Sequence, residues 1–164
     1  MRVNIQRIQR DIENLSSFNA TPGKGVTRLA FTKEDREARE YIKNQMEKIG
    51  LEIYEDGYGN LFGRKYGKDR ELPSVMVGSH YDTVINGGPF DGMAGLVTGL
   101  EIARYLVEEG IEHENTLEVV AFNDEEGVRF GNGISNSRAM TGDMKEEELD
   151  NTFDKNGISL RKAM

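Results

Sequence analysis

The chain has 164 residues, of which 37% are hydrophobic and 30% charged, a composition typical of one folded domain rather than of a disordered chain. Its formal net charge is −8 and no segment is strongly basic, which argues against a nucleic-acid-binding surface. The sequence has no apolar run as long as a membrane span and no cysteine, so disulfides and thiolate metal sites are excluded. We expect a cytoplasmic protein with neither nucleic-acid nor membrane partners.

Two amphipathic helices are expected in the first fifty residues. Hydrophobic side chains recur at helical spacing from Ile5 to Leu15 and predict the first helix. After a Pro- and Gly-containing loop at 21–25, Thr32 and Asp35 resemble a capping box, and Gly50 suits a C-terminal cap. The second helix is therefore expected between Thr32 and Gly50.

Strands and a third helix are expected in the rest of the chain. Residues 51–55 and 61–65 flank a turn and predict a hairpin, and residues 74–78 are typical of a buried strand. A helical pattern begins at Leu96 and ends near Gly110, and the next apolar strand is 117–122. Because strand, helix and strand make a βαβ unit, we predict an α/β fold with a mainly parallel sheet flanked by helices. Ligands bind at the carboxyl ends of such strands.

Polar side chains follow the strand expected at 74–78. His80 and Asp82 stand two positions apart, so on a strand they face the same side. A metal-binding histidine usually donates its second ring proton to a carboxylate or a carbonyl. Asp82 fits this orienting role if the chain bends locally, whereas an isolated His-x-Asp is more often a solvated strand end.

A glycine-rich loop then runs from Asn86 to Gly92 and contains Asp91. Glycines let the backbone approach a ligand closely, although an Asp-Gly pair alone is most often a turn. The position of the loop gives it weight, because it joins the end of the histidine-bearing strand to the next helix. A carboxylate there can bridge two cations.

Glu125 and Glu126 follow the strand expected at 117–122. A glutamate pair is usually surface charge, but side chains diverge after a strand end, so one can bind metal while the other transfers a proton. With His80 and Asp91 they offer one imidazole and several carboxylates. This mixture suits zinc, manganese or cobalt.

Three segments resemble one enzyme family in order and in context: Gly78–Val84, Gly87–Gly92 and Asn123–Phe130. They look like the allantoate amidohydrolase and N-carbamoyl-L-amino-acid hydrolase family, a branch of the dinuclear zinc exopeptidase superfamily. The similarity extends over most of the chain. The short step of eleven positions from His80 to Asp91 favours this branch. Aminoacylase or dipeptidase activity is the weaker alternative.

The resemblance implies a zinc-exopeptidase-like catalytic domain with two divalent ions in the full-length enzyme. His80 would bind one ion, Glu126 the other, and Asp91 both, while Glu125 acts as the general base and Asp82 supports His80. The peptide bond between Asp91 and Gly92 is expected to be cis, as at the bridging aspartate of relatives. The implied reaction is hydrolysis of a linear ureido amide bond in an N-carbamoyl-L-amino acid or in allantoate.

The chain contains only two histidines, and His113 is expected at the surface of a polar loop. Because the family takes further metal-binding histidines from later in its sequence, residues 1–164 are expected to be the N-terminal portion of the catalytic domain. The inserted dimerisation domain and the C-terminal half would be absent, leaving the fold incomplete at its C-terminal side. We expect such a portion to bind metal weakly, to lack activity and to expose apolar surface, whereas the full-length enzyme is expected to be a homodimer.

Two other functions stay open on the sequence alone. One is a binding or scaffold module that has lost catalysis, although the intact Glu125 argues against it. The other is a complete mononuclear hydrolase in which water supplies the fourth ligand beside His80, Asp91 and Glu126. Metal stoichiometry separates these cases. The substrate is not identified, since allantoate, N-carbamoyl-L-amino acids and ureidopropionate all fit.

Overall fold

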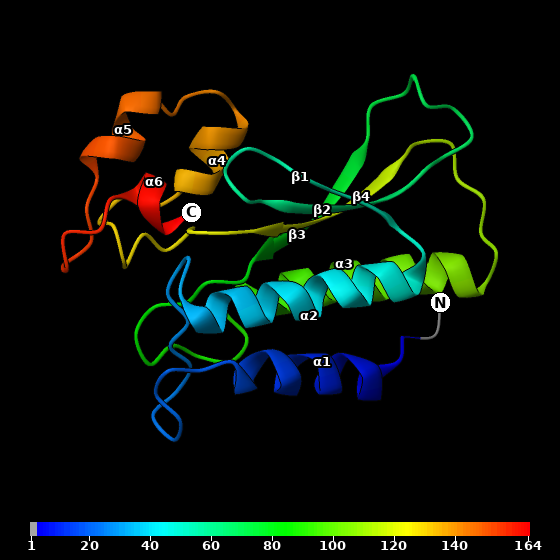
Figure 1. Cartoon of the computed structure of the whole chain (residues 1–164). Helices are drawn as coiled ribbons and strands as arrows, with labels where there is room; N and C mark the ends of the chain where they lie inside the picture. Colours follow the sequence, from blue (N-terminus) through cyan, green and yellow to red (C-terminus); the bar gives the residue numbers. More distant parts are fainter. Residues whose placement is uncertain (1–2) are drawn as a thin grey trace.

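The computed structural model describes residues 3–164 and contains ten helices and strands (Figure 1). In chain order they are α1 (Ile5–Ser17), α2 (Lys33–Ile49), β1 (Glu52–Glu55), β2 (Leu61–Lys65), β3 (Val75–His80), α3 (Met93–Glu108), β4 (Leu117–Phe122), α4 (Ser135–Met140), α5 (Glu146–Asn151) and α6 (Leu160–Ala163). The expected helices, hairpin and strands are all present.

Helix α2 shows how local sequence sets the ends of an element. The hydroxyl of Thr32 accepts a hydrogen bond from the backbone N–H of Asp35, and the Asp35 carboxylate accepts one from the N–H of Phe31. At the other end Gly50 adopts a left-handed conformation with φ 85°, and its N–H donates to the carbonyl of Glu47. The Thr32 N-cap and the Gly50 C-cap are confirmed, but the capping box is not formed, because the Asp35 carboxylate binds the N–H of Phe31 and not that of Thr32.

The four strands form one sheet in the order β1-β2-β4-β3. Strands β3 and β4 are parallel, with His80 opposite Phe122, so the predicted βαβ unit is confirmed. The β1–β2 hairpin joins the other side of β4 through antiparallel pairing. The fold is therefore of the expected α/β class, but the sheet is mixed rather than mainly parallel, because parallel pairing is confined to the two strands whose ends carry the predicted site.

Strand β3 lies at an edge of the sheet, and the prediction that it is buried was wrong. Val75 is 55% exposed and Met76 is 41% exposed, because β3 has a neighbour on one side only. The apolar composition of residues 74–78 correctly predicted a strand, but it did not predict the place of that strand in the sheet. The expected exposed apolar surface is thus present at this edge.

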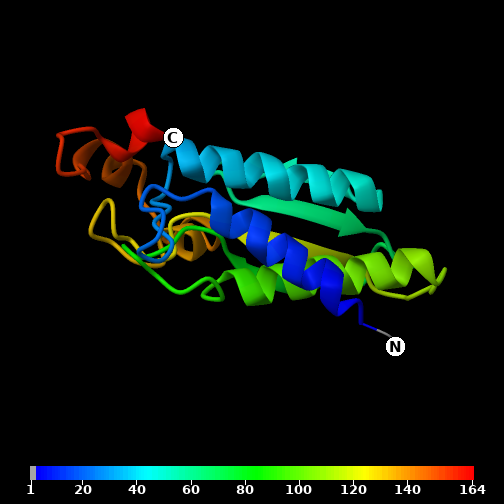
Figure 2. The same cartoon turned by 90° about the horizontal axis from the view of Figure 1, so that it is seen from below.

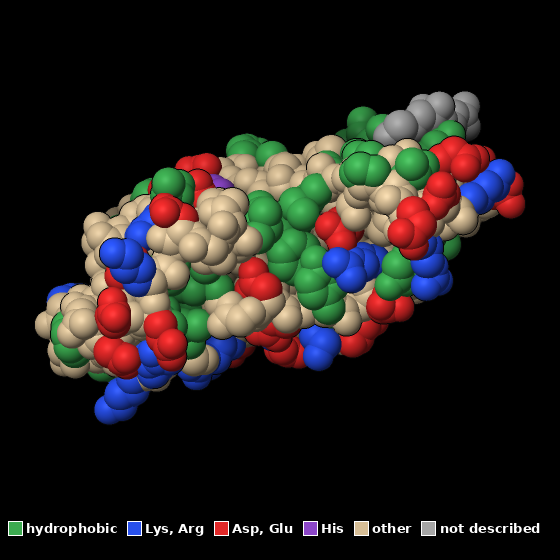
Figure 3. Space-filling view, turned by 90° about the horizontal axis from the view of Figure 1, so that it is seen from above, with side chains coloured by type: hydrophobic (Ala, Val, Ile, Leu, Met, Phe, Trp, Pro, Cys, Tyr) green, Lys and Arg blue, Asp and Glu red, His purple; other side chains and the backbone are tan. Residues whose placement is uncertain are grey.

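Helices α2 and α3 pack on one face of the sheet, and α1 lies outside them against α3 (Figures 1 and 2). The main hydrophobic core lies between this face and the helices and includes Leu15, Ile42, Met46, Leu96, Leu100 and Val119. On the opposite face, hydrophobic side chains gather near the middle of the molecule (Figure 3). None of the helices within residues 3–164 has both the length and the apolar character needed to cross a bilayer.

Candidate metal centre

The predicted site residues meet where β3 and β4 end. His80 is the last residue of β3, and Phe122, its partner in the parallel pair, is the last residue of β4. Beyond these positions both segments leave the sheet: one continues through Asp82 and the other through Glu125 and Glu126. Parallel pairing therefore brings segments more than forty residues apart in sequence into contact.

The imidazole of His80 is oriented by its own strand end. Its Nδ1 atom lies 3.0 Å from the backbone carbonyl oxygen of Asp82, which can only act as a hydrogen-bond acceptor. Nδ1 therefore carries the ring proton in the neutral imidazole, and Nε2 keeps a free lone pair. Nε2 lies 3.6 Å from Oδ1 of Asp91, so the lone pair points to the side where the predicted ligands gather.

His80, Asp91 and Glu126 each place one possible ligand atom within 4.8 Å of the other two. Donors bound at 2.0–2.2 Å to one tetrahedral ion lie about 3.4 Å apart, close to the separation of His80 Nε2 and Asp91 Oδ1. One imidazole and two carboxylates form a donor set that zinc or manganese accepts, and three protein ligands leave a position for water. The residues present therefore fit a divalent ion, and Asp91, with its side chain 57% exposed, leaves the site open to solvent.

Asp82 connects the two strand ends. Its Oδ1 atom accepts a hydrogen bond from the N–H of Glu125 at 3.0 Å, and Oδ2 accepts one from the N–H of Glu126 at 3.1 Å. The same carboxylate lies 3.6 Å from Nδ1 of His80. Asp82 thus contacts both sides of the metal centre: its main chain orients the histidine, and its side chain holds the two glutamates beside it.

Glu125 is half-buried at the bend that follows β4. Its backbone is fixed at both ends, since its N–H donates to Asp82 and its carbonyl accepts from the N–H of Ile134 at 2.7 Å. Its carboxylate forms neither a hydrogen bond nor an ion pair with any side chain of residues 3–164. A fixed backbone with an uncommitted carboxylate is the arrangement that a proton-transfer group next to a metal requires.

The electrostatics of the centre favour a positive charge. Burial lowers the pKa of His80, but the hydrogen bond and the negative charge of Asp82 outweigh it and raise the pKa to about 9. Burial raises the pKa of Glu126, and the negative charge of Asp91 adds to this while His80 acts in the opposite sense. Neighbouring carboxylates therefore repel one another, and a bound cation would relieve that repulsion.

Gly92 packs directly against the histidine. It adopts φ 68°, and a Cβ atom there would lie 2.4 Å from the carbonyl oxygen of His80 and 2.7 Å from its ring. The peptide bond between Asp91 and Gly92 is trans, so the expected cis bond was wrong. The chain makes this turn through a positive φ that glycine adopts readily.

Several polar residues near the centre were not recognised in the sequence. Asp124 is fully buried with φ 60°, and its Oδ2 accepts a hydrogen bond from the hydroxyl of Tyr58 at 2.8 Å. The side-chain oxygen of Asn60 accepts from the N–H of Asn123. In the folded chain, the antiparallel pairing of Leu61 with Ala121 places the turn of the β1–β2 hairpin beside the bend that follows β4.

His113 lies outside the metal centre, as expected, but it is half-buried rather than at the surface. Its Nδ1 contacts the carbonyl of Asn115, and its own carbonyl accepts from the N–H of Lys68, so its loop packs against the segment after β2.

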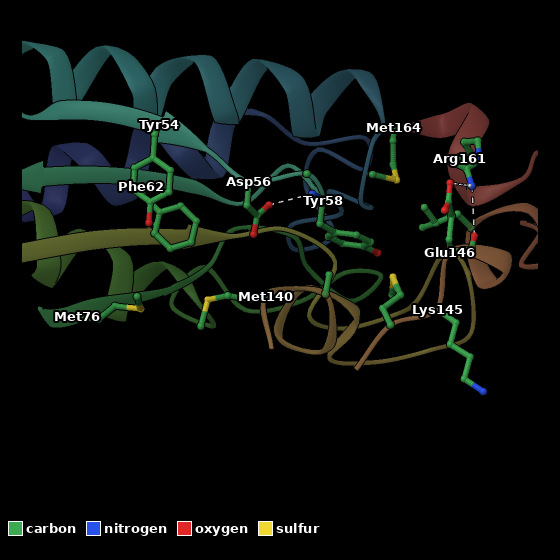
Figure 4. A pocket seen from close by; sticks show the side chains of 14 residues that line it. Tyr54, Asp56, Tyr58, Phe62, Met76, Met140, Lys145, Glu146, Arg161 and Met164 are labelled. Atoms are coloured by element: carbon green, nitrogen blue, oxygen red, sulfur yellow. Dashed lines mark hydrogen bonds and ion pairs between the residues drawn. The ribbon is translucent and has the colours of Figure 1, made fainter. Parts of the chain in front are cut away.

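A cavity of about 590 Å³ opens elsewhere, beside the hairpin on the sheet face without long helices. Figure 4 shows Tyr54 stacked on Phe62 there, with Met76 and Met140 nearby. Its lining includes none of the predicted site residues.

Comparisons with known proteins identify the family of the chain. The model of Peptidase family M28 matches residues 60–153, more than half of the chain. An N-carbamoyl-L-amino-acid amidohydrolase of Pseudomonas sp. is 47% identical over 92% of this chain and 36% of its own length. An allantoate amidohydrolase of Bacillus subtilis is 39% identical over 93% of this chain and 37% of its own.

A solved hydantoinase/carbamoylase family amidase from Burkholderia ambifaria superimposes with a TM-score of 0.92 at 36% identity, over 98% of this chain and 39% of that one. The chain thus spans less than two fifths of the length of each of these three proteins. It belongs to peptidase family M28, and its resemblance to the N-carbamoyl-L-amino-acid and allantoate hydrolases is confirmed.

Proposed function

We propose that residues 1–164 form the N-terminal portion of the catalytic domain of a metal-dependent amidohydrolase that cleaves a linear ureido amide bond. The convergence of His80, Asp91 and Glu126 within 4.8 Å, beside the uncommitted carboxylate of Glu125, carries this proposal. The names of the relatives support the substrate class, an N-carbamoyl-L-amino acid or allantoate. We expect the whole enzyme to bind two divalent ions and to form a homodimer, and the cytoplasmic location stays a prediction.

His80, Asp91 and Glu126 would hold the metal, which when bound supplies a water of lowered pKa and stabilises negative charge on the substrate. The carboxylate of Glu125 takes a proton from the water that adds to the ureido carbonyl carbon. When the carbon–nitrogen bond breaks, Glu125 returns that proton to the leaving nitrogen. Asp82 keeps the backbone of Glu125 in place during both transfers, because it holds the N–H groups of both glutamates.

Glu125→Gln in the full-length enzyme tests the assignment. We expect loss of turnover with metal content unchanged, because glutamine is of the same size but cannot accept the proton. Glu112→Gln is the matched control, since Glu112 is exposed and distant in sequence from the site. Turnover by Glu125→Gln at the wild-type rate would contradict the role of Glu125.

Two measurements separate the remaining alternatives. Hydrolysis of N-acetyl amino acids or dipeptides in preference to N-carbamoyl amino acids would favour an aminoacylase or dipeptidase. Metal analysis of purified protein distinguishes two ions in a full-length dinuclear enzyme from one ion in a mononuclear site on residues 1–164. A chain that binds none would favour a module without catalysis.

A further inference from the structure

The guanidinium of Arg28 is fully buried behind the metal centre, and within residues 3–164 no carboxylate lies at ion-pair distance from it. Its donors reach backbone carbonyls instead. Nε donates to the carbonyl of Tyr81 at 2.6 Å, and Nη1 donates to those of Leu15 at 2.5 Å and Phe18 at 3.1 Å. Nη2 lies 3.1 Å from the sulfur of Met93. One side chain thus ties the end of α1, the strand end of β3 and the start of α3 together.

The backbone of Arg28 holds the same strand end a second time. Its N–H donates to Oγ1 of Thr83 at 2.8 Å, and its carbonyl accepts from the N–H of Thr83 at 2.9 Å. Tyr81 and Thr83 flank Asp82, so both neighbours of Asp82 are bonded to Arg28. Met93 follows Asp91 by two positions, so the contact with its sulfur fixes the other end of the loop that starts at His80.

A buried cation without an anionic partner is costly. Burial lowers the pKa of Arg28 to about 10, which still leaves it charged at neutral pH. An apolar side chain of similar length would fill the space without that cost, but it could not satisfy three carbonyl oxygens, two at the end of α1 and one at the strand end of β3. Lysine could not either, because its donors share one nitrogen, whereas the guanidinium presents five N–H groups in a planar fork.

We propose that Arg28 is a positioning residue for the metal centre: it fixes the bend at Tyr81–Thr83 and the start of α3, and through them the placement of His80, Asp82 and Asp91. This inference rests on the proposed function, because it takes His80 and Asp91 as metal ligands. Arg28 lies behind the backbone of these residues, so its effect on the metal passes through the bend.

The test compares Arg28→Lys and Arg28→Met with the wild-type chain of 164 residues. The first readout is the nitrogen NMR spectrum of the His80 ring, which reports the protonation and the hydrogen bond of the ring to Asp82 without any metal. Only His113 adds a second imidazole, and His113→Gln identifies its signals. The second readout is Zn²⁺ affinity by calorimetry. We expect both variants to shift or broaden the His80 signals and to weaken Zn²⁺ binding about tenfold or more, as loss of groups supporting metal ligands does elsewhere.

Arg104→Met is the matched control. Arg104 is also a buried arginine, but it pairs with Asp11 on α1, away from the strand ends. We expect it to lower stability in urea while leaving the His80 signals and the Zn²⁺ affinity unchanged. Folded Arg28 variants with a wild-type His80 spectrum and wild-type affinity would overturn the proposal.

Two other experimental outcomes also lead to a decision. If neither Arg28 variant folds, the isosteric Thr83→Val decides by the same two readouts, because it removes the hydroxyl that accepts from the N–H of Arg28 and contacts the carbonyls of Val26 and Val84. If the full-length wild-type enzyme binds no Zn²⁺, the proposed function loses its support, while the His80 spectrum of the metal-free variants still tests Arg28 by itself.

Discussion

Two groups of buried polar residues differ in how completely their hydrogen bonds are satisfied. The helix network joins α1, α2 and α3 and consists of Asp11, Tyr41, Gln45 and Arg104. Both oxygens of Asp11 are bonded, one to the hydroxyl of Tyr41 and one to Arg104, which also donates to Gln45. The strand-end cluster lies beside the metal centre and consists of Asp35, Asn123 and Asp124. Each of these three has a buried side-chain oxygen without a partner among residues 3–164.

We interpret this difference as a division of roles: the helix network stabilises the fold, and the strand-end cluster supports the metal centre. A satisfied buried network stabilises one arrangement of the helices, whereas unsatisfied buried acceptors cost free energy. Two features of the strand-end cluster show that its arrangement is costly. The backbone of Asp124 adopts φ 60°, and burial raises the pKa of the Asp35 carboxyl to about 8. The predictions below test this division.

The largest effect on stability is expected in the helix network. Arg104→Met leaves the buried carboxylate of Asp11 without its cation, and removing one partner of a buried pair typically costs about 3–5 kcal/mol. Urea unfolding measures the loss. Zn²⁺ affinity of the folded variant should stay at the wild-type value, and a tenfold loss of affinity would show that the network also serves the site.

Gly92→Ala should have the next largest effect, and it should act on the site. The positive φ alone costs an alanine at least about 1–2 kcal/mol. The added Cβ would also lie 2.4 Å from the carbonyl oxygen of His80, so the ring or the loop must move. We expect Zn²⁺ affinity to fall at least about tenfold. Gly110→Ala is the matched control, because Gly110 has φ 60° but a Cβ there meets no atom within 4 Å.

Asp35→Asn should change the pH dependence of stability. Burial raises the pKa of Asp35 to about 8; the N–H of Phe31 and the charge of Arg28 oppose this, and Asp82 and Asp124 add to it. Because the native state binds the proton more tightly than the unfolded chain, the stability from this group is fully present below about pH 4 and is lost as pH rises through about 8.

Asparagine imitates the protonated acid, so the Asp35→Asn variant should match the wild type near pH 4. It should exceed the wild type by about 1–3 kcal/mol above pH 8. Urea midpoints at a series of pH values check this expectation. Parallel curves for the two proteins would mean that Asp35 stays ionised in the folded chain.

The helix network and the strand-end cluster also differ in how far the sequence predicts them. Local signals suffice for the elements: the Thr32 cap, the Gly50 cap and the strand 117–122 were all predicted and are confirmed. The metal ligands were named from the family resemblance, and residue type and position after the strands only made them candidates. The structure brings His80, Asp91 and Glu126 together, although their binding of metal stays a prediction.

Features that depend on long-range packing were not predicted. The edge position of β3 follows from strand order, which apolar composition does not encode. The bonds between Arg28 and the strand end join residues more than fifty positions apart and use backbone carbonyls, which every residue carries. The hydrogen bond between Tyr58 and Asp124 was not predicted either, because neither residue type is rare in a turn.

Tyr58→Phe should have the smallest effect and tests the strand-end cluster directly. The change removes the hydroxyl that donates to Oδ2 of Asp124 and leaves the aromatic ring packed against Phe31. Because one oxygen of Asp124 already lacks a partner, losing the other bond should cost about 1–2 kcal/mol in urea unfolding. Zn²⁺ affinity should fall less than in Gly92→Ala, since Tyr58 reaches Glu126 only through the backbone that follows Asp124. Tyr66→Phe, which loses an exposed hydroxyl bonded to Glu52, is the control and should change neither quantity. Equal losses in the two variants would mean that the hydroxyl of Tyr58 does no more for the cluster than a surface hydroxyl does.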